Sequence, residues 1–115
     1  MDASLPTRID IDLLIRNMGG NDKIIPKLFE VFWESCDHCI KALDKALLAK
    51  DLKAWKASAH ELKGAALSVT AKRIAGLCEE AGQIHDMKHK DATSLLYHLN
   101  KEIAMLRQEA ARLLG

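Results

Sequence analysis

Apolar residues recur three and four positions apart along most of the chain, which is the spacing of one face of an α-helix rather than the alternation of a strand. A short first helix is predicted from about Thr7 to Asn17, and the segment Met18–Asp22, which holds two glycines, interrupts it. The second helix runs to about Lys50, and Pro26 is acceptable near its first turn. The apolar stripe of this second helix consists of Leu28, Phe32, Cys36, Cys39, Leu43 and Ala46.

Three more helices follow. Asp51 can cap the third helix by accepting a backbone N–H, and Thr70 is the corresponding candidate for the fourth. The polar run Met87–Asp91 is expected to be a connection, and the last helix is predicted from about Ala92 to Leu114. The residues expected to face inward are Leu52, Trp55, Ala59, Leu62, Ala66 and Val69 in the third helix, Ile74, Leu77, Cys78 and Ala81 in the fourth, and Leu95, Leu99, Ile103, Leu106, Ala110 and Leu113 in the last.

Four long amphipathic helices with short connections favour an all-α fold, an up-and-down antiparallel four-helix bundle with a short additional N-terminal helix covering one end. With 115 residues and no internal repeat or long linker, the chain is expected to be a single domain over residues 1–115. Hydrophobic residues make up 49% of it but aromatic residues only 4%, so aliphatic side chains must supply most of the core. Such a domain can stand alone or be a module of a longer protein.

The charges are balanced: 17 basic residues face 16 acidic ones, for a net charge of +1. This balance gives no general attraction to nucleic acid or to an anionic membrane, and the cluster Lys88–Lys90 is too short to change that. No apolar run approaches the roughly 20 residues that span a bilayer, so membrane insertion is not expected. Three cysteines without a disulfide framework fit a reducing, cytoplasmic location.

The third helix carries one histidine away from its apolar stripe. At about 100° per residue, His60 points about 130° from the centre of that stripe, so it is predicted to stand in solvent. Lysines at i−7, i−4 and i+3 surround it, while Ala57 and Gly64 lie on its other side. The three lysines are Lys53, Lys56 and Lys63.

Gly64 bears on access to the imidazole. Helical side chains lean toward the N-terminus, so the residue at i+4 normally shields residue i, and a glycine at 64 removes that shield. Glycine within a helix costs roughly 1 kcal/mol relative to alanine, which suggests a site where close approach matters. A large group could then reach His60 directly.

A neutral exposed imidazole is a nucleophile at cellular pH, and the ammonium of Lys63 could offset the charge of a phosphoryl group placed on it. The surroundings offer neither a nucleotide-binding loop nor an acid–base partner. The residues alone favour an ordinary surface histidine among solvated lysines, because exposed polar faces are the default for helices, and Gly64 narrows this preference without reversing it.

The octapeptide that contains His60 resembles the signature of histidine-containing phosphotransfer (HPt) domains, and the resemblance extends over about residues 13–106. The matching octapeptide is Ala59-His60-Glu61-Leu62-Lys63-Gly64-Ala65-Ala66. Further matches are Ala71, Ile74 and Cys78 downstream, and Gly19-Gly20-Asn21-Asp22, Phe29 or Phe32, and Asp51 with Trp55 upstream.

The resemblance implies a phosphorelay intermediate of two-component signal transduction. His60 would accept a phosphoryl group from a receiver-domain aspartate and pass it to another, with Lys63 compensating charge and Gly64 keeping the approach clear. The chain would have no nucleotide site or cofactor of its own and would not be an enzyme in the usual sense, because the receiver would supply Mg²⁺ and most of the catalysis. Its partners would be response-regulator receiver domains and a hybrid sensor histidine kinase, and it would be a monomer.

The chain departs from the family pattern in three places. Thr70 stands where a glycine is usual, and Ala65 and Ala66 replace common serines. Some members place a glutamine beside the histidine, but Gly82 aligns with that position here, so Gln83 is left out of the site.

Two other patterns could bind a metal or act in redox chemistry. Cys36 and Cys39 are spaced as a redox pair or half a zinc site, but both continue the apolar stripe of their helix, so core packing is favoured. His85 and His89 lie four apart without a third ligand at suitable spacing, so a polar helix end is the better interpretation.

Two other functions compete with the phosphorelay. The segment His60–Lys63 also resembles the start of the dimerisation and phosphorylation motif of sensor kinases, which usually continues with Thr or Asn and then Pro rather than with Gly64-Ala65. A helical adaptor that binds a receiver without phosphorylation is the other possibility. For docking of any partner, the surface around His60 with Ala57 and Leu67 is the candidate, together with neighbouring residues of the second helix.

Overall fold

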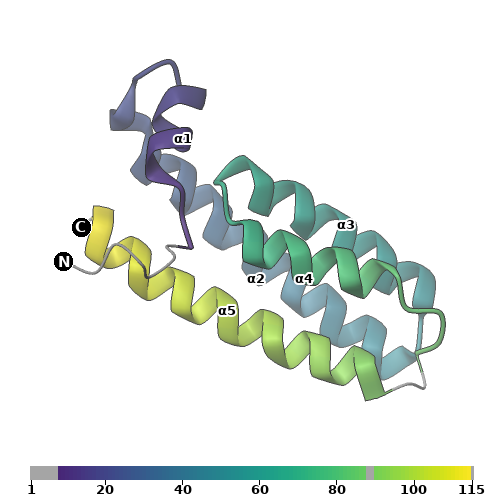
Figure 1. Ribbon diagram of the computed structural model, residues 1–115. Coiled ribbons are helices and arrows are strands. Elements are labelled where there is room, and N and C mark those ends of the chain that lie inside the picture. The colour runs from purple at the N-terminus through teal and green to yellow at the C-terminus, as the bar shows by residue number, and fades with distance from the viewer. Residues whose placement is uncertain (1–7, 88–89, 115) are drawn as a thin grey trace.

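The computed structural model describes residues 8–87 and 90–114, and all the regular elements in this part of the chain are helices (Figure 1). They are α1 (Ile11–Asn17), the 3₁₀ turn η1 (Asp22–Ile24), α2 (Ile25–Ala49), α3 (Leu52–Ser68), α4 (Lys72–Gly82) and α5 (Lys90–Leu114). Helices α2 to α5 run up and down as an antiparallel bundle, as the sequence predicted. Across the described residues, no helix has the combination of length and apolar character that crossing a membrane requires.

The helix boundaries follow from local capping. The side chain of Asp51 accepts the N–H of Ala54 at 3.0 Å, which confirms it as the cap of α3. The first helix begins at Ile11 rather than near residue 7, because Asp10 caps it by accepting the N–H of Leu13; Thr7 lies outside the described residues. The break before η1 uses Gly19 and Gly20 at φ of 66° and 82°, a left-handed conformation that glycine adopts without strain.

Helix α3 buries one face completely. Five residues of the predicted stripe have relative exposures of 0%, namely Trp55, Ala59, Leu62, Ala66 and Val69, whereas the first, Leu52, is only partly buried. The indole Nε1 of Trp55 donates a buried hydrogen bond of 2.9 Å to the carbonyl oxygen of Ala81 near the end of α4. Because a buried donor without a partner is costly, this bond favours one register of α3 against α4.

The predicted stripes of α2 and α5 need correction at their ends. In α2, Ile25 and Phe29 are buried while Leu28 is only partly so. In α5, Leu113 is 48% exposed, against the prediction, and Leu114 is the partly buried residue of the last turn. An α-helix has 3.6 residues per turn, so a stripe assigned at spacings of three or four residues rotates slowly around the helix axis. Along a helix of 25 residues, this rotation moves the inward-facing position by one residue near the ends.

The connection before α5 also differs from the prediction. Met87 is buried at 6% exposure, and α5 already includes Lys90, so the run Met87–Asp91 is not simply a polar linker. Lys88 and His89 lie outside the described residues. Leu77 and Leu95, expected in the core, are partly buried and pack at its edge.

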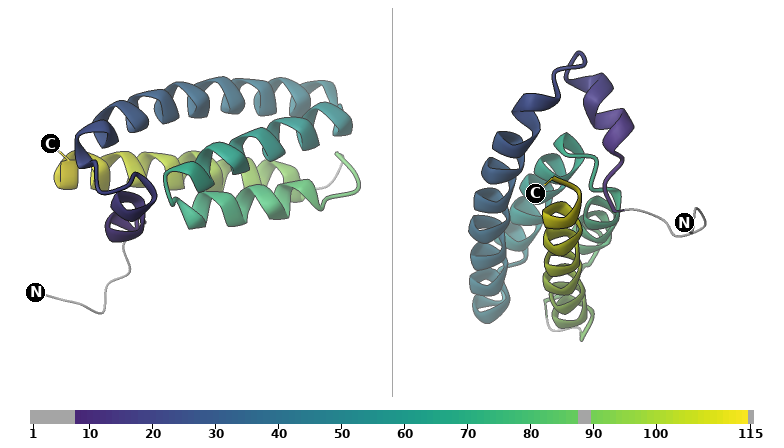
Figure 2. Two further views of the ribbon diagram at one scale, coloured as in Figure 1. Left: turned by 90° about the horizontal axis from the view of Figure 1, so that it is seen from above. Right: turned by 90° about the vertical axis from the view of Figure 1, so that its left-hand side faces the viewer.

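Helix α1 lies at the end of the bundle where α2 begins and α5 ends (Figure 1 and Figure 2). At about 1.5 Å per residue, α3 and α4 are too short to cover the whole of α2 and α5. Leu14 of α1 and Ile9 before it are buried and join the common core. The prediction that the first helix covers one end is therefore confirmed.

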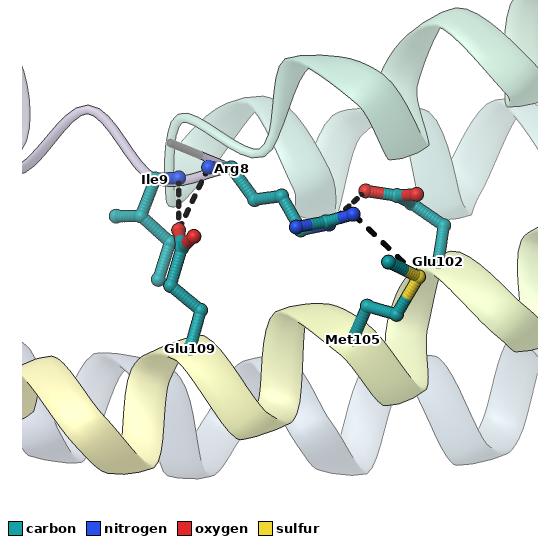
Figure 3. Close-up of polar contacts among 5 residues, drawn as sticks. All are labelled: Arg8, Ile9, Glu102, Met105 and Glu109. Carbon is teal, nitrogen blue, oxygen red and sulfur yellow. Dashed lines mark hydrogen bonds and ion pairs between the residues drawn. The ribbon is translucent and has the colours of Figure 1, made fainter. Parts of the chain in front are cut away.

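A buried carboxylate attaches the segment before α1 to the bundle (Figure 3). Glu109 of α5, 6% exposed, accepts the backbone N–H groups of Arg8 at 2.7 Å and Ile9 at 3.0 Å. The Nε of Arg8 donates at 2.6 Å to Glu102, which lies about two turns before Glu109 on α5. The guanidinium of Arg8 also contacts the sulfur of Met105. Charge-assisted bonds of this kind are among the stronger ones in proteins, so the first described residues are held firmly against α5.

Thr70 does not cap α4. The N-cap residue is Ala71, which makes no side-chain cap bond. Thr70 lies in the turn before it at φ of 61°, and its hydroxyl accepts the N–H of Asp10 at 3.0 Å and donates to the carbonyl of Asp10 at 3.3 Å. The left-handed conformation explains why glycine suits this position, and the two bonds show what the threonine contributes in its place: it joins the α3–α4 turn to the start of α1.

We expect Thr70→Gly to be more stable than Thr70→Ala by about 1 kcal/mol in the free energy of unfolding. Both variants lose the hydroxyl bonds to Asp10, but only glycine is free of the steric cost at positive φ. Urea titration of the two variants and the wild type measures the difference. A Thr70→Ala protein as stable as Thr70→Gly would show that the turn carries no such strain.

Candidate functional site

His60 stands exposed near the middle of α3, on the side away from the buried stripe. Within the described residues its side chain makes no hydrogen bond and no ion pair. The exposure predicted from the helical wheel is confirmed. Both imidazole nitrogens are therefore open to a reacting group from outside.

Gly64 lies one turn further along α3, also exposed. A Cβ atom placed there would meet nothing within 4 Å. No internal contact therefore demands a glycine, and its φ is not in the left-handed region. What the missing side chain does provide is open space above the turn that holds His60, because a side chain at i+4 would lean toward it.

The three lysines around His60 differ in their surroundings. Lys63 is half-buried and its ammonium lies 3.9 Å from a carboxylate oxygen of Glu79 on α4. Lys53 is exposed and Lys56 partly buried, and neither forms an ion pair with another described residue. The sequence did not indicate Glu79, because only the packing of α3 against α4 brings it near Lys63.

Glu61 borders the site on the side of α2. Its carboxylate accepts a hydrogen bond of 3.2 Å from the thiol of Cys39 and lies 3.8 Å from Nε2 of His38. Neither contact could be read from the sequence, because each joins residues more than twenty positions apart. The lysines beside His60 are thus accompanied by two carboxylates, Glu61 on α3 itself and Glu79 on α4.

Two hollows among the described residues lie away from His60. One of about 650 Å³ lies between α4 and α5 and one of about 720 Å³ between α2 and α5, and neither is lined by a residue of α3. Gln83, left out of the site on sequence grounds, follows the last residue of α4 and lines the first hollow together with His85 and His98. His60 therefore lies on an open face of α3, outside both hollows.

The cysteines are core residues, as their place in the apolar stripes predicted. Cys36, Cys39 and Cys78 are 1–2% exposed and unpaired. Among the described residues no three His, Cys, Asp or Glu side chains gather as metal ligands would. Burial raises the pKa of each thiol to about 12, and in Cys39 the hydrogen bond to Glu61 adds to this effect.

The family assignment rests on a match to the model of the Hpt domain over residues 27–109, most of the chain. The chain belongs to the Hpt domain family. It therefore has a phosphorelay role in which a histidine carries a phosphoryl group between proteins. Hpt domains are phosphotransfer carriers rather than enzymes in the usual sense, and they work with receiver domains.

A solved structure supports the fold. The chain is similar to histidine-containing phosphotransfer protein B (HptB) from Pseudomonas aeruginosa PAO1, with a TM-score of 0.79 and 24% sequence identity over 96% of this chain and 98% of the other. No match was found among curated proteins. The helical bundle of this Hpt domain is thus one already seen in a phosphotransfer protein.

The raised thiol pKa values predict that all three cysteines are inert in the folded Hpt domain. Because a thiolate is the reacting form, alkylation by iodoacetamide at pH 8 should be at least about 100-fold slower in the native chain than in urea. The fold favours the neutral thiols, so their stabilising contribution is complete below the pKa of an unfolded thiol and is lost as the pH rises toward about 12. Mass spectrometry of labelled peptides would reveal any cysteine that reacts equally fast in both states.

Proposed function

We propose that His60 is the residue of this Hpt domain that is phosphorylated. The observation that carries the proposal is its bare imidazole on the outer face of α3, free of partners among the described residues and beside an unshielded turn at Gly64. A family that transfers phosphoryl groups through histidine needs such a ring. Of the described histidines, only His60 lies within the octapeptide that resembles the family signature.

The step we propose is an exchange of one P–O bond for one P–N bond. A nitrogen of neutral His60 attacks the phosphorus of a receiver's aspartyl phosphate, and the aspartate carboxylate leaves with the bonding electrons. The reverse reaction with a second receiver passes the phosphoryl group on. Geometry and charge stabilisation supply most of the rate in such transfers, since little else is required of the protein.

Lys63 and Gly64 support this step in different ways. The ammonium of Lys63, on the turn after His60, compensates the negative charge that the phosphoryl group adds. Gly64 leaves the path open along which the receiver approaches. Mg²⁺ and the groups that bind it belong to the receiver, and the chain contributes the nucleophile and its surroundings.

The partners we propose are receiver domains of response regulators and of a hybrid sensor histidine kinase, met by the chain as a cytoplasmic monomer. A partner would dock on the face of α3 around His60. Leu67, 52% exposed two turns from the histidine, offers an apolar contact there, and exposed Ala57 a small one. Hydrophobic anchors of this kind often provide much of the affinity of a transient interface.

The direct test is phosphoryl uptake from a phosphorylated receiver by wild type, His60→Ala and His98→Ala. His98 is a matched control, because it is also an exposed histidine on a helix of the bundle. We expect acid-labile, alkali-stable label on wild type and on His98→Ala and none on His60→Ala. Label on His60→Ala at the wild-type level would place the phosphoryl group elsewhere.

Gly64→Leu tests the access argument, with Gly76→Leu as its control. Both glycines lie in exposed helical positions with open space around a Cβ, so both variants should gain helix stability, up to about 1 kcal/mol. Only Gly64→Leu should slow phosphoryl transfer, by at least about 10-fold. Thermal unfolding and transfer kinetics on the same samples separate the two effects, and equal transfer rates for both variants would refute the role of Gly64.

A further inference from the structure

The ammonium of Lys63 already has a partner before any phosphoryl group arrives. Its Nζ lies 3.9 Å from Oε2 of Glu79, across the seam between α3 and α4. The side chain of Lys63 is 34% exposed and that of Glu79 is 59% exposed, so water screens the pair in part. The contact is therefore adjustable rather than locked.

Lys63 connects the two helices: it lies three residues after His60 on α3, and its ion pair reaches α4. Helical side chains lean toward the N-terminus of their helix, which carries the ammonium of Lys63 toward the turn that holds His60. Lys63 also acts on buried Cys78 of α4, where its charge partly counters the rise in thiol pKa that burial causes. Glu79 follows Cys78 directly on α4 and is linked to the site through its ion pair with Lys63.

The other nearby carboxylates are engaged differently. Glu61 is bound to the thiol of Cys39 and lies near His38, both on α2. Glu80 lines the hollow between α4 and α5 and forms no ion pair with Lys63 in the described part of the chain. Among these carboxylates, Glu79 is thus the one that forms an ion pair with Lys63.

A phosphoryl group on His60 brings about −1.5 to −2 charges near the same ammonium. Lys63 cannot bind the phosphoryl oxygens and Glu79 equally well at once. The carboxylate also repels the new charge directly. Both effects disfavour the phosphorylated state relative to a site without Glu79.

We propose that Glu79 is a positioning residue that holds Lys63 beside unphosphorylated His60 and competes with the phosphoryl group for it. The competition keeps the phosphohistidine energetically high enough to be passed on rather than stored. This inference rests on the proposed function, in which His60 is the phosphorylated residue.

The test measures the equilibrium constant for phosphoryl exchange between the chain and one receiver domain. The chain is first loaded with phosphoramidate, a small donor from which the phosphoryl group moves to the imidazole nitrogen as ammonia leaves. Glu79→Gln should shift the exchange equilibrium toward the phosphorylated chain by about two- to five-fold, the range expected for a solvent-screened ion pair. Glu80→Gln, with the same charge change one position along α4, should leave it unchanged.

Two further variants separate positioning from a merely structural effect. Glu79→Asp keeps the negative charge and should stay within about two-fold of wild type. In a Lys63→Ala background the effect of Glu79→Gln should shrink, because only the direct repulsion of the phosphoryl group remains. Thermal unfolding midpoints should agree within a few degrees for all variants, as expected for an exposed pair.

The outcomes distinguish the two proposals. If the wild type is phosphorylated on His60 and Glu79→Gln leaves the equilibrium constant unchanged, or if Glu79→Asp behaves like Glu79→Gln, the role of Glu79 is overturned and the proposed function stands. An equal effect of Glu79→Gln with and without Lys63 overturns it as well. If the wild type takes up no phosphoryl group on His60 from either donor, the proposed function fails and the role of Glu79 with it.

Discussion

The hydrogen bond between the Trp55 indole and the Ala81 carbonyl sets the register of α3 against α4. Trp55 is fully buried, and its hydrogen bond of 2.9 Å links the first turns of α3 to the last turns of α4. Water cannot reach a buried indole N–H, so a shift of one helix along the other would leave this donor without a hydrogen bond. The register that results brings Lys63 within reach of Glu79 and leaves His60 on the opposite side from the core.

The chemistry of the site follows from being on a surface rather than in a pocket. The hollows between α4 and α5 and between α2 and α5 are lined by other helices, and His60 lies outside them. A phosphoryl carrier gains from this, because its donor and its acceptor must both reach the same nitrogen. Under the proposed function, the chain contributes the nucleophile, and the receiver contributes the enclosing and metal-binding groups.

At the end of the bundle that α1 covers, the main polar contacts are made to the backbone. Helices α3 and α4 stop short, and the residues before α1 are drawn into the gap by Glu109 of α5 and by the hydroxyl of Thr70. Both contacts bind backbone N–H groups, so they depend little on which side chains the segment carries. A left-handed threonine in place of glycine is tolerated there because its hydroxyl makes two bonds that glycine could not.

The sequence alone determined the all-helical bundle, the cap at Asp51, the buried stripe of α3 and the exposure of His60, because each depends on a periodicity or a bond within a few residues. It misplaced the inward residue at the end of α5 and the role of Thr70, where helix drift and a partner sixty residues away decide. It also placed the start of α1 too early, because the local cap at Asp10 was not identified. Glu79, Glu61 and Glu109 could not be assigned from the pattern at all. Their partners lie on another helix or, for Glu109, in the segment before α1, and only the packing of the bundle brings the two sides of each contact together.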